Sequence, residues 1–269
     1  METDVVISGG GPVGLMLACE LRLAGVDVLV VERLTEIDAT IKAAGINVPT
    51  AESMYRRGLL PALAEQHAAH VHSPFGDQGL NLGIGDAVNL GWKLAATIRG
   101  GAPEGLLDSY TAERHPIGAW VLDWSRAQVA LMRPDVRTNA LRDVVTDLLS
   151  TRDGSTYLAK KLSGLLHRYP LDGDHELIGT SSPDFEFADG SRLGEHLRDG
   201  KALLLDFTAS GALRDLAADR VRTLTVKCVS HSAVTGVLVR PDGIIAWARE
   251  DDGTDGLENA LRTWLGGEK

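Results

Sequence analysis

Residues 5–14 read Val-Val-Ile-Ser-Gly-Gly-Gly-Pro-Val-Gly, an apolar run followed at once by closely spaced glycines. The run from Asp4 to Ser8 predicts a short strand, and apolar residues recur at helical spacing after Pro12: Leu15, Ala18, Leu21 and Leu23. Val26–Val31 is rich in β-branched residues, which predicts a second strand, parallel to the first and buried on both faces. Strand, helix and strand in this order predict a right-handed βαβ unit.

The glycines have the spacing G-x-G-x-x-G in the context that a dinucleotide-binding turn requires, after a strand and at a helix start. Gly9 would allow the tight turn, Gly11 the close approach of a pyrophosphate, and Gly14 the packing of the helix on the strand. The helix that starts at Pro12 presents the free N–H groups that follow it, from Val13 onward, and a partial positive charge to the phosphates. The alternative is a glycine-rich turn that binds no ligand.

Glu32 ends the second predicted strand about twenty residues further on, where a carboxylate can accept both hydroxyl protons of an adenosine ribose. This position favours FAD or NAD over NADP. Arg33 follows directly, either as a further cofactor contact or as a solvated surface charge.

A second glycine-rich segment, residues 70–83, precedes a predicted helix and again offers oriented N–H groups to an anion. His70 and His72 are interpreted as loop or core histidines rather than metal ligands, because no third ligand stands at a matching spacing. No metal site is expected. Cys19 and Cys228 are far apart in the sequence and are interpreted as buried thiols.

The formal charge is −10 and the pI is near 5.3, and no run of Lys or Arg could follow a phosphate backbone, so nucleic acid is not expected as a partner. No segment reaches the roughly 18 apolar residues of a membrane span, and the N-terminus lacks the pattern of a signal peptide. These features predict a cytoplasmic protein without a membrane segment.

Helical periodicity predicts five further helices, followed by a loop or linker at 170–182: residues 50–65, 83–99, 104–131, 135–150 and 155–168. Beyond the linker, the pattern predicts strand, helix, strand, hairpin and helix: residues 202–207, 212–218, 222–229, 237–247 and 257–265. This order suggests a small thioredoxin-like α/β domain. The predicted division is a dinucleotide-binding domain at 1–134, a helical connection at 135–182 and the C-terminal domain at 183–269.

The chain resembles the class A flavoprotein monooxygenases in three places. Residues 5–14 look like their ADP-binding start, residues 69–94 resemble their flavin-contacting motif, and Tyr110, Glu113, Arg114 and Pro116 resemble their Y-x-x-E-R-x-P helix end. Among these enzymes the motifs are most similar to aromatic polyketide hydroxylases of antibiotic pathways. The resemblance implies a Rossmann-like FAD-binding domain of the para-hydroxybenzoate hydroxylase type, with a C-terminal thioredoxin-like domain.

The resemblance also implies site residues, all of them cofactor contacts because the flavin performs the chemistry. Those for the ADP half would be Gly9, Gly11, Gly14 and Glu32, with Lys42 near the cofactor, and those along the isoalloxazine would be Pro74, Gly76, Gly79, Leu80 and Asn81. NADPH would reduce the flavin, and O₂ would be used to hydroxylate an aromatic polyketide.

The sequence departs from the family pattern because the long middle segment with the substrate-binding sheet is missing after about residue 66. Gln66 and His67 also replace the family's Gly-Asp pair. Two parallel strands alone would leave exposed sheet edges, which predicts a cover for those edges, either a missing segment or a second copy of the chain. Two other functions stay open: a non-catalytic remnant acting as a binding or assembly subunit, and an NAD-dependent dehydrogenase.

Overall fold

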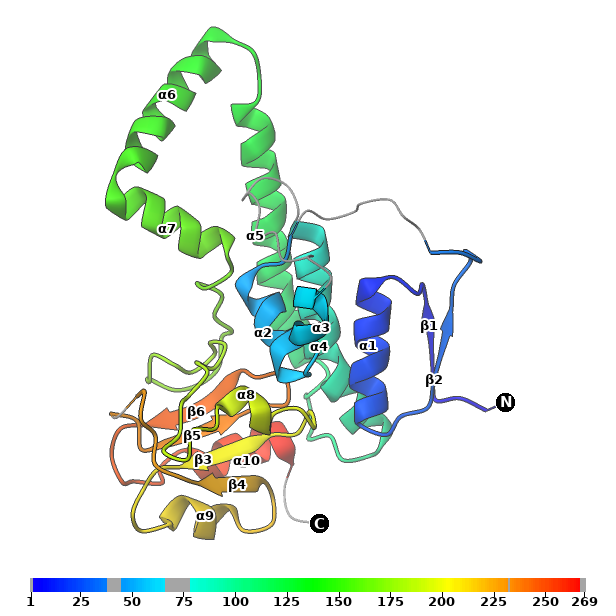
Figure 1. Cartoon of the computed structure of the whole chain (residues 1–269), viewed down its shortest axis with the longest axis vertical. Helices are drawn as coiled ribbons and strands as arrows, with labels where there is room; N and C mark the ends of the chain where they lie inside the picture. The colour runs from blue at the N-terminus through cyan, green and yellow to red at the C-terminus, as the bar shows by residue number, and fades with distance from the viewer. Residues whose placement is uncertain (1, 38–44, 66–77, 232, 267–269) are drawn as a thin grey trace.

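The computed structural model describes residues 2–37, 45–65, 78–231 and 233–266, and opens with the predicted βαβ unit. Strands β1 and β2 pair in parallel, with α1 packed against one face (Figure 1); the bounds are β1 Val5–Ser8, α1 Pro12–Leu23 and β2 Val28–Val31. The prediction that the second strand is buried on both faces was wrong, because Leu29 and Val31 are exposed on its outer face, next to the exposed Val6 of β1. Cys19 is exposed as well, whereas Cys228 is buried as predicted.

Four helices follow, with bounds α2 Val48–Arg56, α3 Leu60–Glu65, α4 Gln78–Ile98 and α5 Ser109–Leu131. The single helix predicted at 50–65 is two helices, because the chain turns at Gly58, where φ is +71°. Pro61 lies in the first turn of α3, a position where its missing N–H costs nothing. Helix α4 begins five residues earlier than predicted.

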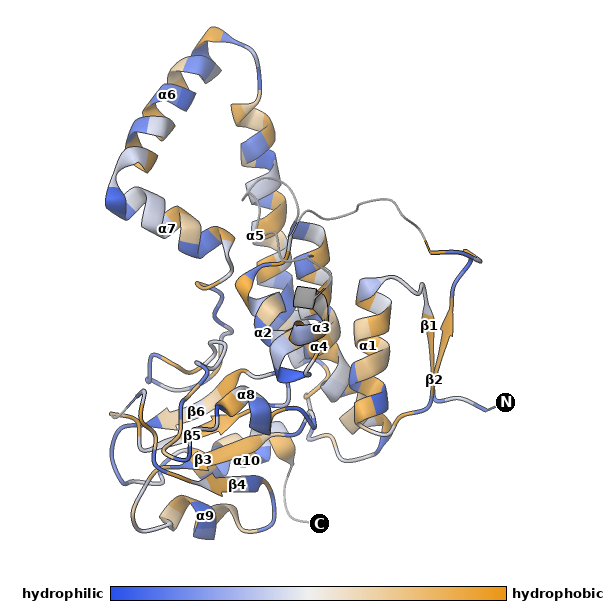
Figure 2. Cartoon of the chain, viewed as in Figure 1, coloured by the Kyte–Doolittle hydropathy of each residue, from blue (hydrophilic) through white to orange (hydrophobic). Residues whose placement is uncertain are grey.

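Helices α6 Val136–Ser150 and α7 Arg152–Leu162 form an arm that projects away from the rest of the molecule (Figure 1). Both starts are capped by side chains, since Asp135 accepts the N–H groups of Arg137 and Thr138 and Thr151 accepts that of Gly154. No side chain of α6 is buried, and apolar side chains lie exposed along it (Figure 2).

The C-terminal part contains a four-stranded sheet in the order β4-β3-β5-β6. Strands β3 and β4 are parallel and the other neighbours are antiparallel; the strands are β3 Leu203–Asp206, β4 Arg222–Thr225, β5 Gly236–Val239 and β6 Ile245–Arg249. The predicted hairpin turns at Gly243, where φ is +80°. Helices α9 Ala212–Ala217 and α10 Leu257–Leu265 appear as predicted, while the one-turn helix α8 Leu193–His196 was not foreseen.

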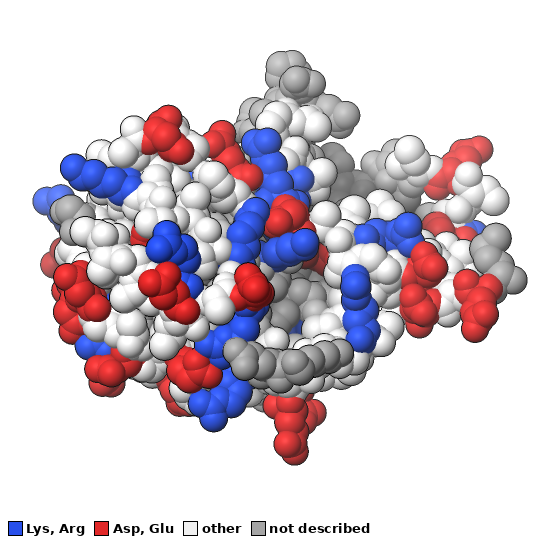
Figure 3. Space-filling view, turned by 90° about the horizontal axis from the view of Figure 1, so that it is seen from below, with Lys and Arg blue, Asp and Glu red and all other residues white. Residues whose placement is uncertain are grey.

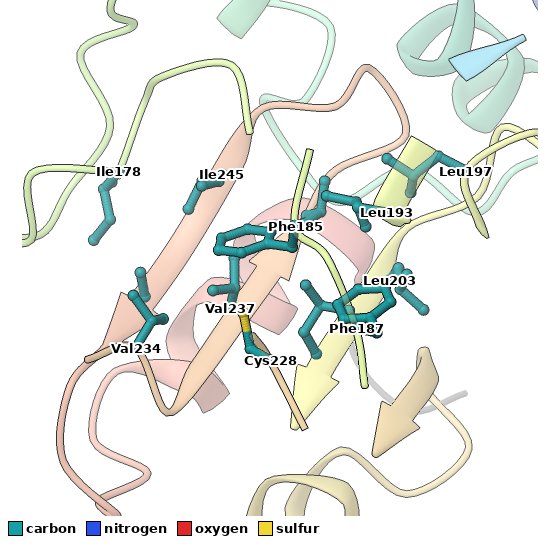
Figure 4. Close-up of a cluster of buried hydrophobic side chains, with 13 residues drawn as sticks. Ile178, Phe185, Phe187, Leu193, Leu197, Leu203, Cys228, Val234, Val237 and Ile245 are labelled. Carbon is teal, nitrogen blue, oxygen red and sulfur yellow. The ribbon is translucent and has the colours of Figure 1, made fainter. Parts of the chain in front are cut away.

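Both faces of this sheet are covered by apolar side chains. Side chains of α9 and α10 cover one face: Leu213, Ala217, Leu257, Ala260 and Leu261. The irregular chain between residues 178 and 197 covers the other, as Figure 4 shows, with Ile178, Phe185, Phe187, Leu193 and Leu197. The stretch 170–182 has no helix or strand, as predicted, but its last residues pair with the hairpin, since Ser181 bridges Ile244. The division into domains stays a prediction.

Candidate functional site

The turn between β1 and α1 adopts the conformation of an anion-binding helix start. Gly9 has φ +110°, which favours glycine, and its N–H donates to the Val31 carbonyl over 2.8 Å. Gly11 is the N-cap of α1 and supplies no capping side chain, and Pro12 follows in the first turn. The first amides of α1 therefore have no side-chain acceptor from the cap residue and face an exposed surface at Gly11 and Pro12.

Two glycines of this turn differ in what surrounds them. A Cβ on Gly14 would lie 2.1 Å from the Gly9 carbonyl oxygen and 3.4 Å from Ile7 Cγ2, so the helix packs on the turn at a distance that only glycine permits. A Cβ on Gly11 would meet no atom within 4 Å. The space over Gly11 is open, as the approach of a diphosphate requires.

Glu32 connects the end of β2 to this turn. Its carboxylate accepts the N–H of Gly10 over 2.7 Å and that of Leu34 over 3.0 Å. These two N–H groups, together with the neighbouring Arg33 charge, lower the pKa of Glu32, so that it is anionic at neutral pH. An exposed carboxylate retains free lone pairs, so it can also accept hydroxyl protons of a ribose. Arg33 is exposed.

The start of α4 contains the three described residues predicted to lie along the flavin. Gly79 is exposed, with open space where a Cβ would be. Leu80 packs into an apolar cluster with Met16 and Ile84, so only its backbone can face a ligand. Asn81 is buried, and its side chain accepts the Asn47 N–H over 2.8 Å, which positions the chain before α2. The predicted contacts Lys42, Pro74 and Gly76 lie outside the described residues, as do His70 and His72.

Helices α1 and α4 lie against each other (Figure 1), and glycines of α4 allow the approach. A Cβ on Gly83 would lie 2.6 Å from Val13 Cγ2, and one on Gly91 would lie 2.5 Å from Glu20 Cβ. Val13, predicted as a cofactor contact, therefore also packs between the helices. Neither helix has an acidic residue in its first turn, so two partly positive helix starts face the same part of the molecule. This arrangement fits a ligand with a diphosphate and an electron-rich ring.

A buried charge cluster connects α4 and α5 to the C-terminal sheet, and sequence reasoning missed it. Lys93 Nζ lies 2.9 Å from Glu113 Oε2, and Arg240 forms two hydrogen bonds of 2.8 Å to the same carboxylate. Arg240 also pairs with Asp242, and Asn89 donates to Glu113 over 2.6 Å. The sequence predicts only a hairpin at residues 237–247, because the pairing of Arg240 with Glu113 depends on a residue far away in the sequence.

Two cations and two anions balance within this cluster. Although burial acts to raise them, the pKa values of Glu113 and Asp242 are lowered by hydrogen bonds and charge from Arg240. Burial and the Arg240 charge lower the pKa of Lys93 to about 8. Arg240 also lies over the rings of Trp92 and Trp264, at 5.3 and 4.4 Å from the centroids. The cluster is tightly packed around Arg240, which favours a structural role of these charges over a catalytic role.

A cavity of about 120 Å³ lies between α2, α4, α5 and the chain at 164–181. His167 lines it, and burial, with the Arg114 and Lys161 charges, lowers the pKa of His167 to about 4.

Within the described part of the chain, no group of three His, Cys, Asp or Glu side chains could hold a metal ion. No described helix is long and apolar enough to cross a membrane. On the face shown in Figure 3, acidic and basic side chains are interspersed, without a stripe of one sign.

Comparison with protein families matches two segments of the chain. Residues 2–67 and 67–125 match the model described as FAD binding domain, in two pieces that meet where the sequence predicts the missing middle. Residues 175–267 match the model described as aromatic-ring hydroxylase, C-terminal.

Curated relatives include 12-dehydrotetracycline 5-monooxygenase/anhydrotetracycline 6-monooxygenase of Streptomyces rimosus, 47% identical over 224 residues, 79% of this chain and 44% of the relative. The rifampicin monooxygenase of Streptomyces venezuelae is 43% identical over 199 residues, 74% of this chain and 41% of the relative. This chain thus spans less than half the length of these relatives.

A solved structure, the OxyS anhydrotetracycline hydroxylase from Streptomyces rimosus, superposes with a TM-score of 0.90 at 27% identity, covering 100% of each chain. The chain has the glycine turn of α1, the two adjacent helix starts of α1 and α4, and the C-terminal sheet. It therefore belongs, as a shortened chain, to the FAD-dependent aromatic-ring hydroxylases.

Proposed function

We propose that this protein is an FAD- and NADPH-dependent monooxygenase that hydroxylates an aromatic polyketide in antibiotic biosynthesis, with O₂ as co-substrate. The observation that carries the proposal is the pair of adjacent helix starts. Helix α1 starts at the open turn of Gly11 with no side-chain cap, and α4 starts at Gly79, where a Cβ would also meet open space. The relatives named as tetracycline and rifampicin monooxygenases support the substrate class.

The chain's own residues would bind and orient the cofactor. The turn from Gly9 to Gly14 would hold the diphosphate, Glu32 would accept the ribose hydroxyls, and the first amides of α4 at Gly79–Asn81 would face the pyrimidine edge of the flavin. Lys42, Pro74 and Gly76 belong to the same proposed site. Bound FAD would supply the redox chemistry, and the helix starts would favour negative charge on its ring.

A second copy of the chain is the proposed cover for the outer face of β1 and β2. Val6 is 59% exposed, Val31 50% and Leu29 44%, so a continuous apolar strip meets solvent. Such a strip next to unpaired strand edges favours self-association. We place the protein in the cytoplasm.

The test is reconstitution of the purified chain with FAD, followed by removal of free cofactor and an absorption spectrum. A bound flavin band and NADPH oxidation that rises when anhydrotetracycline is added support the proposal. The same mixture without anhydrotetracycline measures uncoupled oxidation. A colourless protein after reconstitution, with no NADPH oxidation, overturns it.

A second candidate is a non-catalytic remnant that acts as a binding or assembly subunit. The specific observation that favours it is length, since the chain spans only 44% of the tetracycline monooxygenase that it resembles. Retained flavin without any substrate-dependent NADPH oxidation would favour this role over catalysis.

A further inference from the structure

The side chain of Arg114 joins three separate segments beside the start of α4. Its Nε donates to Asp86 Oδ1 over 2.7 Å, its Nη2 to the Leu82 carbonyl over 3.1 Å, and its Nη1 to the Tyr169 hydroxyl over 3.0 Å. The side chain is 8% exposed. Three charge-assisted bonds in a fixed planar fork restrict both position and orientation.

Helix α4 provides a place for this guanidinium at Gly85. A Cβ at Gly85 would lie 2.7 Å from Arg114 Nη2 and 3.1 Å from Cζ, so the guanidinium lies directly against the helix backbone. Any larger residue at this position would displace it. Leu82 and Asp86 lie on either side of Gly85 in the second and third turns of α4.

The first turn of α4 precedes these contacts by only a few residues and contains the amides assigned above to the flavin. Arg114, on α5, donates hydrogen bonds to α4, and it also donates one to the hydroxyl of Tyr169, which lies later in the chain. Asn81 adds a separate restraint through Asn47. The charge cluster around Lys93 holds the same helix at a later turn and has no hydrogen bond to Leu82 or Asp86.

We propose that Arg114 is a positioning residue that fixes the first turns of α4 for the ring half of FAD. This inference rests on the proposed function. Two groups of contacts act on different parts of α4. Arg114 fixes the cofactor-binding end of the helix, and Lys93 with its partners fixes the later turns. The ADP half, bound at α1, does not depend on Arg114.

The test compares Arg114→Met, Gly85→Ala and Tyr169→Phe with Lys93→Met, the control at a buried cation of the same helix. Dissociation constants for FAD and for ADP, and amide hydrogen exchange of residues 79–82 without cofactor, are measured where every variant is folded. Arg114→Met and Gly85→Ala are expected to weaken FAD at least tenfold, leave ADP within twofold and speed exchange at 79–82. Tyr169→Phe should have a smaller effect, and Lys93→Met none at these amides.

Unchanged FAD affinity and unchanged exchange in Arg114→Met, or an equal loss of FAD and ADP, overturn the positioning role. An effect of Lys93→Met as large as that of Arg114→Met overturns it too, because it reduces the result to general helix stability. A wild-type chain that binds ADP but not FAD overturns the proposed function instead. The exchange measurement without cofactor then still decides whether Arg114 orders this turn.

Discussion

Gly11 and Gly14 belong to the same helix start, yet their surroundings predict different losses on substitution. Gly14→Ala places a methyl group 2.1 Å from the Gly9 carbonyl oxygen, and forced packing of this kind costs about 1–3 kcal/mol. Gly11→Ala meets no protein atom, so its free energy of unfolding should fall by less than about 1 kcal/mol. FAD affinity should fall at least tenfold in both. Denaturant titration and cofactor binding check this, and equal stabilities would contradict the packing argument.

The burial of His167 predicts that the protein becomes less stable in mild acid. Burial lowers its pKa to about 4, against 6.5 as the ordinary value, so between these limits the unfolded chain binds more protons than the folded chain. The free energy of unfolding should therefore decrease as pH falls from 6.5 to 4, by up to about 3 kcal/mol. Denaturant titrations across this interval should show a shallower decline for His167→Gln.

The control variant is His115→Gln, because His115 is exposed on α5 and does not line the cavity. A wild-type slope that persists in His167→Gln would assign the acid sensitivity to other groups.

At the scale of elements, the crossing of α1 and α4 depends on small residues. Gly91→Ala would place a Cβ 2.5 Å from Glu20 Cβ and disturb the buried pair in which Arg57 Nε lies 2.7 Å from Glu20 Oε1. We expect the melting temperature to fall, with a loss of about 1–3 kcal/mol. Gly118→Ala is the matched control, because this α5 glycine has open space at its Cβ and alanine favours helix by about 1 kcal/mol. An unchanged melting temperature in Gly91→Ala would show that α1 and α4 can move apart without loss of stability.

Element predictions from sequence succeeded where the pattern was long and local. The βαβ unit, the hairpin and α10 follow from apolar spacing and turn residues, since these act within a few positions. The helix at 50–65 was wrong because Gly58 takes a left-handed conformation that the apolar spacing does not reveal. Exposure of the outer strand face was also missed, because a continuous apolar run does not show what covers it.

At the scale of the whole molecule, the buried charge cluster should determine whether the C-terminal sheet and the helices unfold together. Glu113→Gln leaves the Lys93 ammonium facing a neutral amide and removes one of the two carboxylates that pair with Arg240, so that Asp242 remains. Breaking a buried pair costs about 3–5 kcal/mol. We expect a large loss in denaturant titration. Asp123→Asn removes an exposed pair and should change stability by less than about 1 kcal/mol. Equal effects of the two variants would show that the cluster contributes nothing beyond a surface ion pair.

The amino-acid order alone specified the glycine turn, the acidic residue after the second strand and the family of the chain, because each depends on residues close together in sequence. Only tertiary packing placed the start of α4 beside that of α1 and gathered Lys93, Glu113, Arg240 and Asp242 into one buried cluster. The contact between Glu113 and Arg240 joins residues 127 positions apart. The net free energy of the cluster is the balance between the cost of desolvating its charges and the gain from their mutual pairing, which no local pattern of residues encodes.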